Sequence, residues 1–289
     1  MRPRAPSHPW LMLGPSVLVL ATFFVAPLAL AVRDSLTSWD LLSPPVYVGL
    51  ANYARLVASG ELAALVGRTL QFALVVVSLS MSLGLALALA LNRPGRLVAF
   101  VRSAVFSAYV VSWVSVALLW MWLLDADQGV FAAGARALGL GRVGFLTDPG
   151  VARLTLAVVT VWKITGFSMV VFLVGLQDVP RDLLEAASLD GAGAWARFRH
   201  VTWPLLRPTA AFVGTTSLIA SFQAFDVVRV MTQGGPVKAT TLLVYAIYEQ
   251  VFLDLRVGRA SALTVVFFAL LSGLSMLQLW LMRGRGGRA

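Results

Sequence analysis

The sequence predicts an all-α, polytopic membrane protein that crosses the bilayer as a single domain. Of its 289 residues, 59% are hydrophobic and only 12% are charged, whereas a water-soluble domain typically carries about 25% charged residues. The mean hydropathy is +0.84. The apolar residues also gather in long runs, and a transmembrane helix needs roughly 20 of them in succession. Lipid is therefore the expected surroundings of most of the chain.

Six apolar runs are long enough to span a membrane. They cover residues 10–32, 69–91, 103–124, 151–176, 205–225 and 260–282. A further apolar patch, 242–253, is too short to span and is interrupted by Glu249, so we expect an interfacial or re-entrant helix there. The chain then consists of a tail over 1–9, one six-helix membrane domain over 10–282 and a tail over 283–289.

The first apolar run could instead be a secretory signal peptide. Arg2 and Arg4 precede it, and residues 29–31 resemble a cleavage site. However, the run is longer than a usual signal core and contains Pro15 and Pro27. We therefore expect a helix that stays in the mature protein.

The placement of basic residues predicts the orientation of the spans. The connections after the second and fourth spans are short and rich in arginine, and arginines also flank the first and last spans. These residues are Arg2, Arg4, Arg93, Arg96, Arg102, Arg181, Arg197, Arg199, Arg207, Arg283, Arg285 and Arg288. The remaining connections, 33–68, 125–150 and 226–259, are longer and carry basic residues more sparsely. By the positive-inside rule both termini and the fourth connection face the cytoplasm.

Several classes of site are excluded by composition. The absence of cysteine rules out disulfides, zinc fingers, iron–sulfur clusters and thiol nucleophiles. His8 and His200 are too few for a histidine metal site. The net charge of +10 is spread between the apolar runs and no nucleic-acid motif is present, so we expect no nucleic-acid partner. The two lysines, Lys163 and Lys238, do not follow a glycine, so the chain has no phosphate-binding loop of its own.

The fourth connection, residues 177–204, is polar and rich in small residues. Pro180 suits the first turn of a helix, and acidic Glu185 favours its positive end. Asp190 and Gly191 end that helix, since glycine readily takes the left-handed cap. A second short helix is expected to follow, with Trp195, Phe198 and Val201 on one face, and Pro204 and Pro208 are expected to start the next span. From these signals alone, a docking helix–turn–helix and a plain solvated loop are equally compatible with the sequence.

The same connection resembles a known family motif. Glu185-Ala186-Ala187, three residues, Gly191, nine residues, Val201, one residue and Trp203-Pro204 reproduce the spacing of the EAA loop in binding-protein-dependent ABC importer permeases. Val201 and Trp203 replace the usual isoleucine and leucine, and both replacements are apolar. The segments 48–57, 83–93, 161–180, 231–252 and 258–263 are also similar to the carbohydrate subfamily of the maltose or glycerol-3-phosphate type.

The resemblance implies a type I ABC importer permease fold, a place in a bacterial inner membrane and a set of partners. These would be a second homologous permease subunit, two cytoplasmic ABC ATPase subunits, an extracytoplasmic solute-binding protein, a sugar-like solute and the lipid bilayer. The chain would have no catalytic residue, metal or cofactor of its own, since ATP and Mg²⁺ would be bound by the ATPase. The residues that would couple transport to the ATPase are Glu185, Ala186, Ala187, Asp190, Gly191, Trp195, Phe198 and Pro204.

Polar and aromatic residues within the spans are candidates for the solute path. Lys163 lies near the middle of the fourth span, and ionisable residues at such depth are costly. Phe222, Gln223, Phe225 and Asp226 end the fifth span, and sugars are bound by hydrogen bonds together with stacking on aromatic rings. The alternatives are helix packing for the aromatic residues, and an ion pair or carbonyl contact for Lys163.

An ion-gradient-driven secondary transporter or channel is the alternative class. Such proteins often carry relays of buried acids or histidines and show repeated halves. Here Lys163 stands alone at depth and no repeat is visible. Among sugar-like solutes, the sequence does not choose between disaccharides, oligosaccharides, amino-sugars and glycerol-3-phosphate.

Overall fold

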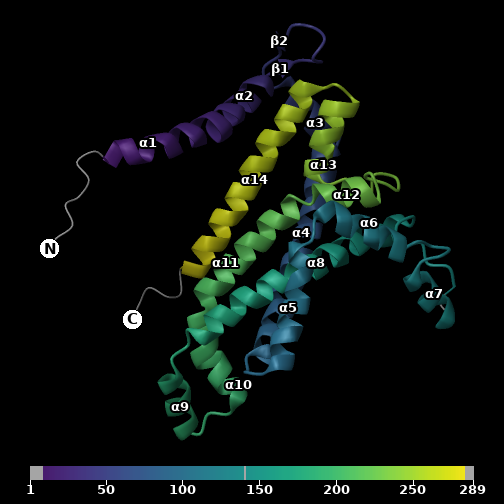
Figure 1. Cartoon of the computed structure of the whole chain (residues 1–289). Helices are drawn as coiled ribbons and strands as arrows, with labels where there is room; N and C mark the ends of the chain where they lie inside the picture. The colour runs from purple at the N-terminus through teal and green to yellow at the C-terminus, as the bar shows by residue number, and fades with distance from the viewer. Residues whose placement is uncertain (1–8, 140, 284–289) are drawn as a thin grey trace. The chain divides into compact units, whose positions relative to one another are not determined.

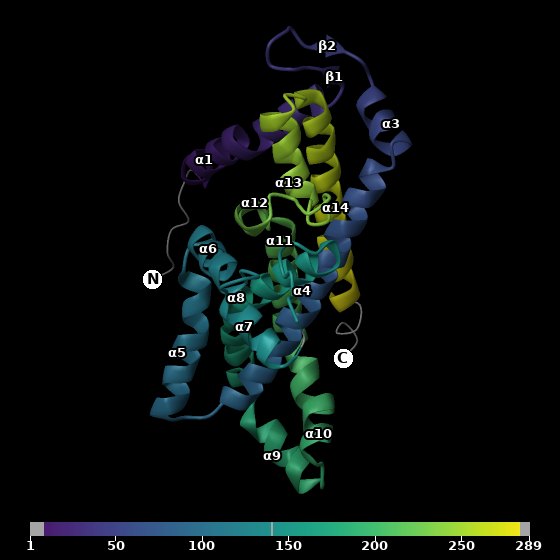
Figure 2. The same cartoon turned by 90° about the vertical axis from the view of Figure 1, so that its right-hand side faces the viewer.

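The computed structural model describes residues 9–139 and 141–283, and these form helices apart from one short hairpin (Figures 1 and 2). Most of the tails predicted at 1–9 and 283–289 lie outside the described residues. The chain divides into two units, which are taken separately below. One unit comprises 1–63 and 246–269, and the other comprises 64–245 and 270–289.

The first unit begins with a helix long enough to cross a membrane. Its segments α1 (Pro9–Leu20), η1 (Ala21–Val25) and α2 (Ala26–Asp34) follow one another without a gap. The span predicted at 10–32 is thus confirmed as a helix, with 22 residues over Leu13–Asp34 that pass the length and hydropathy requirements of a span.

A small hairpin and a short helix follow in this unit. Strands β1 (Thr37–Ser38) and β2 (Val46–Tyr47) pair antiparallel, and α3 covers Ala51–Ala58. The buried Asn52 amide donates to the carbonyl oxygens of Ser35 and Thr37, both at 2.8 Å, and so ties α3 to the hairpin. The sequence did not predict the strands, because two residues are too few to show an alternating pattern.

Three helices contain residues of both units. They are α4 (Glu61–Leu91), α13 (Leu243–Tyr248) with its π-helical extension η3 (Glu249–Leu253), and α14 (Val257–Arg283). The second and sixth predicted spans are therefore confirmed as helices, and α4 begins two turns before the predicted residue 69. The short apolar helix expected at 242–253 is present as Leu243–Leu253.

The second unit holds the remaining helices. They are α5 (Arg96–Val110), α6 (Trp113–Leu123), α7 (Val130–Ala137), α8 (Pro149–Gln177), α9 (Arg181–Leu189), α10 (Ala194–Arg197), η2 (Phe198–Thr202), α11 (Trp203–Phe222) and α12 (Phe225–Met231). The fourth span, predicted at 151–176, is confirmed by α8, whose first turn is capped by the Asp148 carboxylate.

The third predicted span, 103–124, is not one continuous helix. Helices α5 and α6 pass the span requirements only together, and they are bent by 102° at Val111 and Ser112. Both residues have extended backbone angles, with ψ of 145° and 140°, which interrupt the helical hydrogen bonds. The apolar run gave no proline or glycine signal for this break, so the prediction of a straight helix was wrong.

The core of the second unit is built around α8. Its buried residues Met169, Phe172 and Leu173 pack with Ala88 of α4 and with residues of α11. Small residues permit this close approach, since a Cβ added at Gly84 would lie 2.6 Å from Ser168 Cβ. Packing through small residues is the usual way in which helices associate within lipid.

Candidate coupling projection and solute path

Helices α9 and α10 form a projection at one end of the second unit. In both views they lie beyond the ends of α8 and α11 (Figures 1 and 2). Helix α8 ends at Gln177 and α9 begins at Arg181, with Pro180 at its N-cap. No residue of α9 is buried. The helix–turn–helix predicted for residues 177–204 is present.

The turn between α9 and α10 is a Schellman motif centred on Gly191. The Gly191 N–H donates to the Ser188 carbonyl at 3.1 Å, and the Ala192 N–H donates to the Ala187 carbonyl at 2.9 Å. Gly191 has a φ of +80°, a left-handed conformation that costs other L-residues roughly 1–2 kcal/mol. Asp190 occupies the C-cap position. The glycine is therefore required by backbone geometry.

The second helix of the projection is continuous with the fifth span. Helix α10 passes through the π-helical η2 directly into α11, so the second short helix and the span that follows it form one continuous helix. Pro204 lies in the first turn of α11, where a missing N–H is tolerated. The projection is thus attached to α8 through a short loop on one side and to α11 without interruption on the other.

Side chains brace the projection internally. The Arg197 guanidinium donates to Ser188 Oγ at 3.0 Å and links α10 to α9. The rings of Trp195 and Phe198 stack with centroids 5.6 Å apart, and Phe198 also contacts Trp203, with 6.2 Å between the centroids. A movement of α9 would therefore be transmitted through these contacts to the first turn of α11.

The outer surface of the projection offers small and apolar groups. Glu185 and Ala186 are exposed, Ala187 is half-buried, and Trp195 is 70% exposed. Leu189 is 90% exposed. Such a surface suits a docking partner, because small residues allow close approach and an exposed aromatic ring can enter a pocket. The coupling roles of these residues stay predictions.

The structure brings four of the predicted path residues together at a break between α11 and α12. Phe222 ends α11 and is fully buried, Gln223 is exposed, and Phe225 and Asp226 are half-buried in the first turn of α12. The Phe225 N–H donates to the Gln223 carbonyl at 2.7 Å. The intervening Ala224 has φ −72° and ψ 52°, close to an inverse γ-turn. Their role in a path stays a prediction.

Lys163 lies on another element and has a different environment. Its side chain is 1% exposed, and its ammonium donates to the carbonyl oxygens of Ala108 and Tyr109 at 3.2 Å each, and to that of Val111. The C-terminal carbonyls of a helix lack intrahelical partners, and these three lie where α5 ends. The carbonyl contact foreseen as an alternative for Lys163 is thus present, whereas its role in the solute path stays a prediction.

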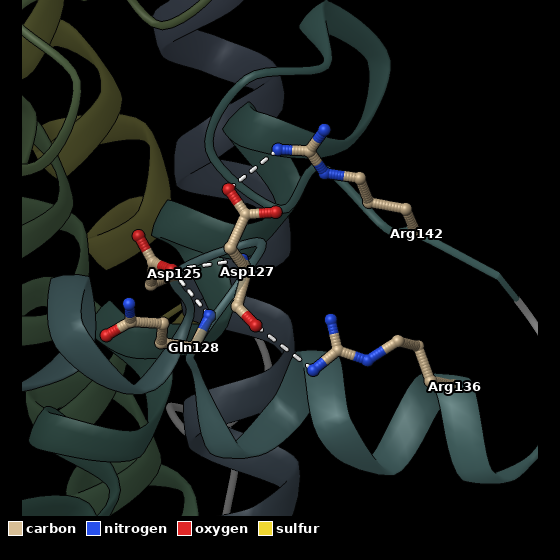
Figure 3. A network of polar contacts seen from close by, with 5 residues as sticks. All are labelled: Asp125, Asp127, Gln128, Arg136 and Arg142. Carbon is tan, nitrogen blue, oxygen red and sulfur yellow. Dashed lines mark hydrogen bonds and ion pairs between the residues drawn. The ribbon is translucent and has the colours of Figure 1, made fainter.

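The connection between α6 and α8 contains a polar network that sequence patterns did not reveal (Figure 3). Asp125 accepts hydrogen bonds from the N–H groups of Gln128 at 2.8 Å and Asp127 at 3.0 Å. Arg142 pairs with the Asp127 carboxylate at 2.8 Å, and Arg136 donates to the Asp127 carbonyl at 3.0 Å. The Gln128 and Asp127 amides, with the charge of Arg142, hold the pKa of Asp125 below its ordinary value of 3.8.

Comparison with known proteins gives one consistent result. Residues 80–285 match the family model described as "Binding-protein-dependent transport system inner membrane component". The sn-glycerol-3-phosphate transport system permease protein UgpA of Rhizobium meliloti (strain 1021) is 30% identical over 276 residues, covering 93% of this chain and 92% of the relative. UgpA of Yersinia pestis bv. Antiqua (strain Antiqua) is 31% identical over 272 residues, with the same coverage.

Solved structures show the same fold. A chain of a bacterial ABC transporter involved in the import of the acidic polysaccharide alginate superposes with a TM-score of 0.81 at 22% identity. The match covers 95% of this chain and 94% of that chain. A chain of the bacterial alginate ABC transporter in complex with alginate pentasaccharide-bound periplasmic protein gives a TM-score of 0.80 at 22% identity, covering 97% and 95%.

Proposed function

This chain belongs to the binding-protein-dependent transport system inner membrane components, and we propose that it forms half of the pathway of an ATP-driven importer for a sugar or sugar-like solute. It is a permease subunit of a multi-pass inner membrane system and not itself the catalytic part. The partners proposed are a second homologous permease, two cytoplasmic ATPase subunits and an extracytoplasmic solute-binding protein.

The projection formed by α9 and α10 carries this proposal. An ATPase can shift the equilibrium between permease conformations only through contacts that differ between them. The exposed surface around Ala186 and Trp195 is available for such contacts. The Schellman turn at Gly191 and the unbroken passage of α10 into α11 give the projection a defined shape and a direct connection to a span.

Two observations support a sugar-like solute: the side chains at the α11–α12 break and the cargoes named for the relatives. The accessible residues at the α11–α12 break, Phe225, Gln223 and Asp226, suit a hydroxyl-rich ligand, because a ring can stack on a sugar face while amide and carboxylate groups bind its hydroxyls. The names of the relatives give sn-glycerol-3-phosphate and the acidic polysaccharide alginate as their cargoes. We propose a sugar-like solute for this chain, without assigning either of these.

Transport by the assembled importer tests the proposal. Vesicles containing both permeases and the ATPase pair should accumulate the solute only when the binding protein is outside and ATP is inside. A single cysteine replacing the exposed Ala186 can then be cross-linked, since the chain has no cysteine of its own. The ATPase subunit should be the protein captured. Uptake driven by an ion gradient through this chain alone would favour the secondary-transporter alternative and contradict the proposal.

A further inference from the structure

A cavity of about 450 Å³ lies at the base of the projection, where several helices of the second unit end. It is bounded by the residues that follow α4, by α5, by the end of α8 and by the start of α9. Its basic residues are Arg93, Arg102 and Arg181. Leu176 and Leu184 contribute an apolar wall.

No carboxylate neutralises the three arginines within residues 9–139 and 141–283. Arg102 donates to the backbone carbonyls of Leu91 and Arg93, and Arg93 Nε donates to the Ala90 carbonyl at 3.1 Å. The Ala90 and Leu91 carbonyls end α4, so the guanidinium groups cap this helix while no carboxylate offsets their charge. In the described part of the chain, the Arg181 side chain makes no hydrogen bond or ion pair. The cavity is therefore suited to an anion.

The position of the cavity indicates what kind of anion it would meet. Long apolar helices end here, at Leu91 of α4 and Gln177 of α8, so this level corresponds to the headgroup layer of a bilayer. Leu97 and Phe100 on α5 are 75% and 70% exposed, as expected of side chains in contact with lipid. Anionic lipids attract clusters of basic residues beside the ends of transmembrane helices.

We propose that this cavity binds the phosphate of an anionic phospholipid headgroup, with its acyl chains directed into the bilayer. A guanidinium presents a planar set of donors that matches phosphate oxygens. Arg181 keeps this whole set, whereas Arg93 and Arg102 use some of their donors on backbone carbonyls and contribute their remaining N–H groups and their charge. An acidic side chain of the ATPase is the other conceivable occupant. The lipid is favoured because the cavity lies at the level of the helix ends and has an apolar wall.

The cavity shares residues with the coupling helix. Arg181 and Leu184 belong to α9, so a bound headgroup would contact the helix that carries Glu185 and Ala186. Anionic lipid would then hold α9 in place and raise coupling efficiency. This regulatory effect rests on the proposed function, whereas the binding of lipid itself does not.

Selective retention of lipid tests the binding directly. The intact chain in vesicles of phosphatidylcholine would be titrated with spin-labelled phosphatidylglycerol, and the motionally restricted fraction would be measured by electron paramagnetic resonance. Arg181→Gln removes one charge without disturbing a described contact, and Arg93→Gln with Arg181→Gln removes two. We expect the preference for phosphatidylglycerol to fall about fivefold for each arginine removed.

Matched controls identify the source of any effect. Arg199→Gln changes the net charge equally but lies outside the cavity, and it should leave the lipid preference unchanged. Equal restriction of phosphatidylcholine, or displacement of the lipid by millimolar inorganic phosphate, would overturn the proposal. So would displacement by added ATPase together with loss of ATPase binding in the variants. Failure of ATP-driven uptake would contradict the proposed function but would leave the lipid preference intact.

Discussion

The Lys163 ammonium lies 4.8 Å from the centroid of the Trp113 ring, at the bend between α5 and α6. The same ammonium donates to carbonyls at the end of α5, including that of Val111. The charge is thus held by backbone dipoles and an aromatic face. This one side chain stabilises both ends of the break, which explains how an interrupted helix is tolerated among apolar surroundings.

Replacing Lys163 should loosen this bend. Lys163→Met keeps the length and apolar stem of the side chain but leaves the α5 carbonyls unpaired, so we expect a loss of about 1–3 kcal/mol in stability. Lys163→Arg retains donors and should recover part of it. Thermal unfolding in detergent measures the difference, with Lys238→Met, at an exposed residue, as the control.

A transport assay distinguishes the role of Lys163 in stabilising the α5–α6 bend from its predicted role in the solute path. A Lys163→Met protein that is less stable yet shows an unchanged KM for uptake would remove Lys163 from the path. A rise in KM at a temperature where the variant remains folded would support the path. Unchanged stability would contradict the account of the bend.

Gly166 should not tolerate a side chain, because α5 lies against it. It lies one turn from Lys163 on α8, and an added Cβ would lie 2.5 Å from the Val105 carbonyl oxygen. Gly166→Ala should therefore separate α5 from α8 and cost about 1–3 kcal/mol. Gly67→Ala is the matched control, since nothing lies within 4 Å of its Cβ position and alanine favours helix. Equal melting temperatures for the two variants would contradict the close approach.

The sequence predicted much of this organisation, and the reasons for its failures are physical. Length and hydropathy placed α4, α8 and α14, because a span must be apolar over its whole length. The same criterion could not detect the bend at Val111, where the freed carbonyls are satisfied by Lys163 from another helix. The turn at Gly191 was predictable, because the signal is local. The cavity at Arg102 was not, because it depends on where distant helix ends meet.

The connection that contains Asp125 should respond to acid. The pKa of Asp125 in the folded protein is below the ordinary 3.8. The stabilisation of this connection by the Asp125 carboxylate is therefore fully present above pH 3.8, and it is lost as the pH falls through the lowered pKa of the folded protein. A nitroxide on Ala133→Cys should thus become mobile only in strong acid. Asp125→Asn should make it mobile at neutral pH, and Asp127→Asn should affect it less. A transition between pH 5 and 7 would contradict the assignment.

Uptake by Gly191 variants tests whether the projection transmits the movement of the ATPase to the spans. Gly191→Pro is incompatible with a φ of +80° and removes the N–H that donates to Ser188. Gly193→Ala is the matched control, because Gly193 has a φ of −67° and open space at its Cβ position.

In vesicles that contain the assembled importer, Gly191→Pro should abolish ATP-dependent uptake while circular dichroism still reports an inserted helical protein. Gly193→Ala should transport normally, and Gly191→Asn should retain part of the activity, because asparagine tolerates the left-handed conformation. Normal ATP-dependent uptake by an inserted Gly191→Pro protein would contradict the coupling role of the projection.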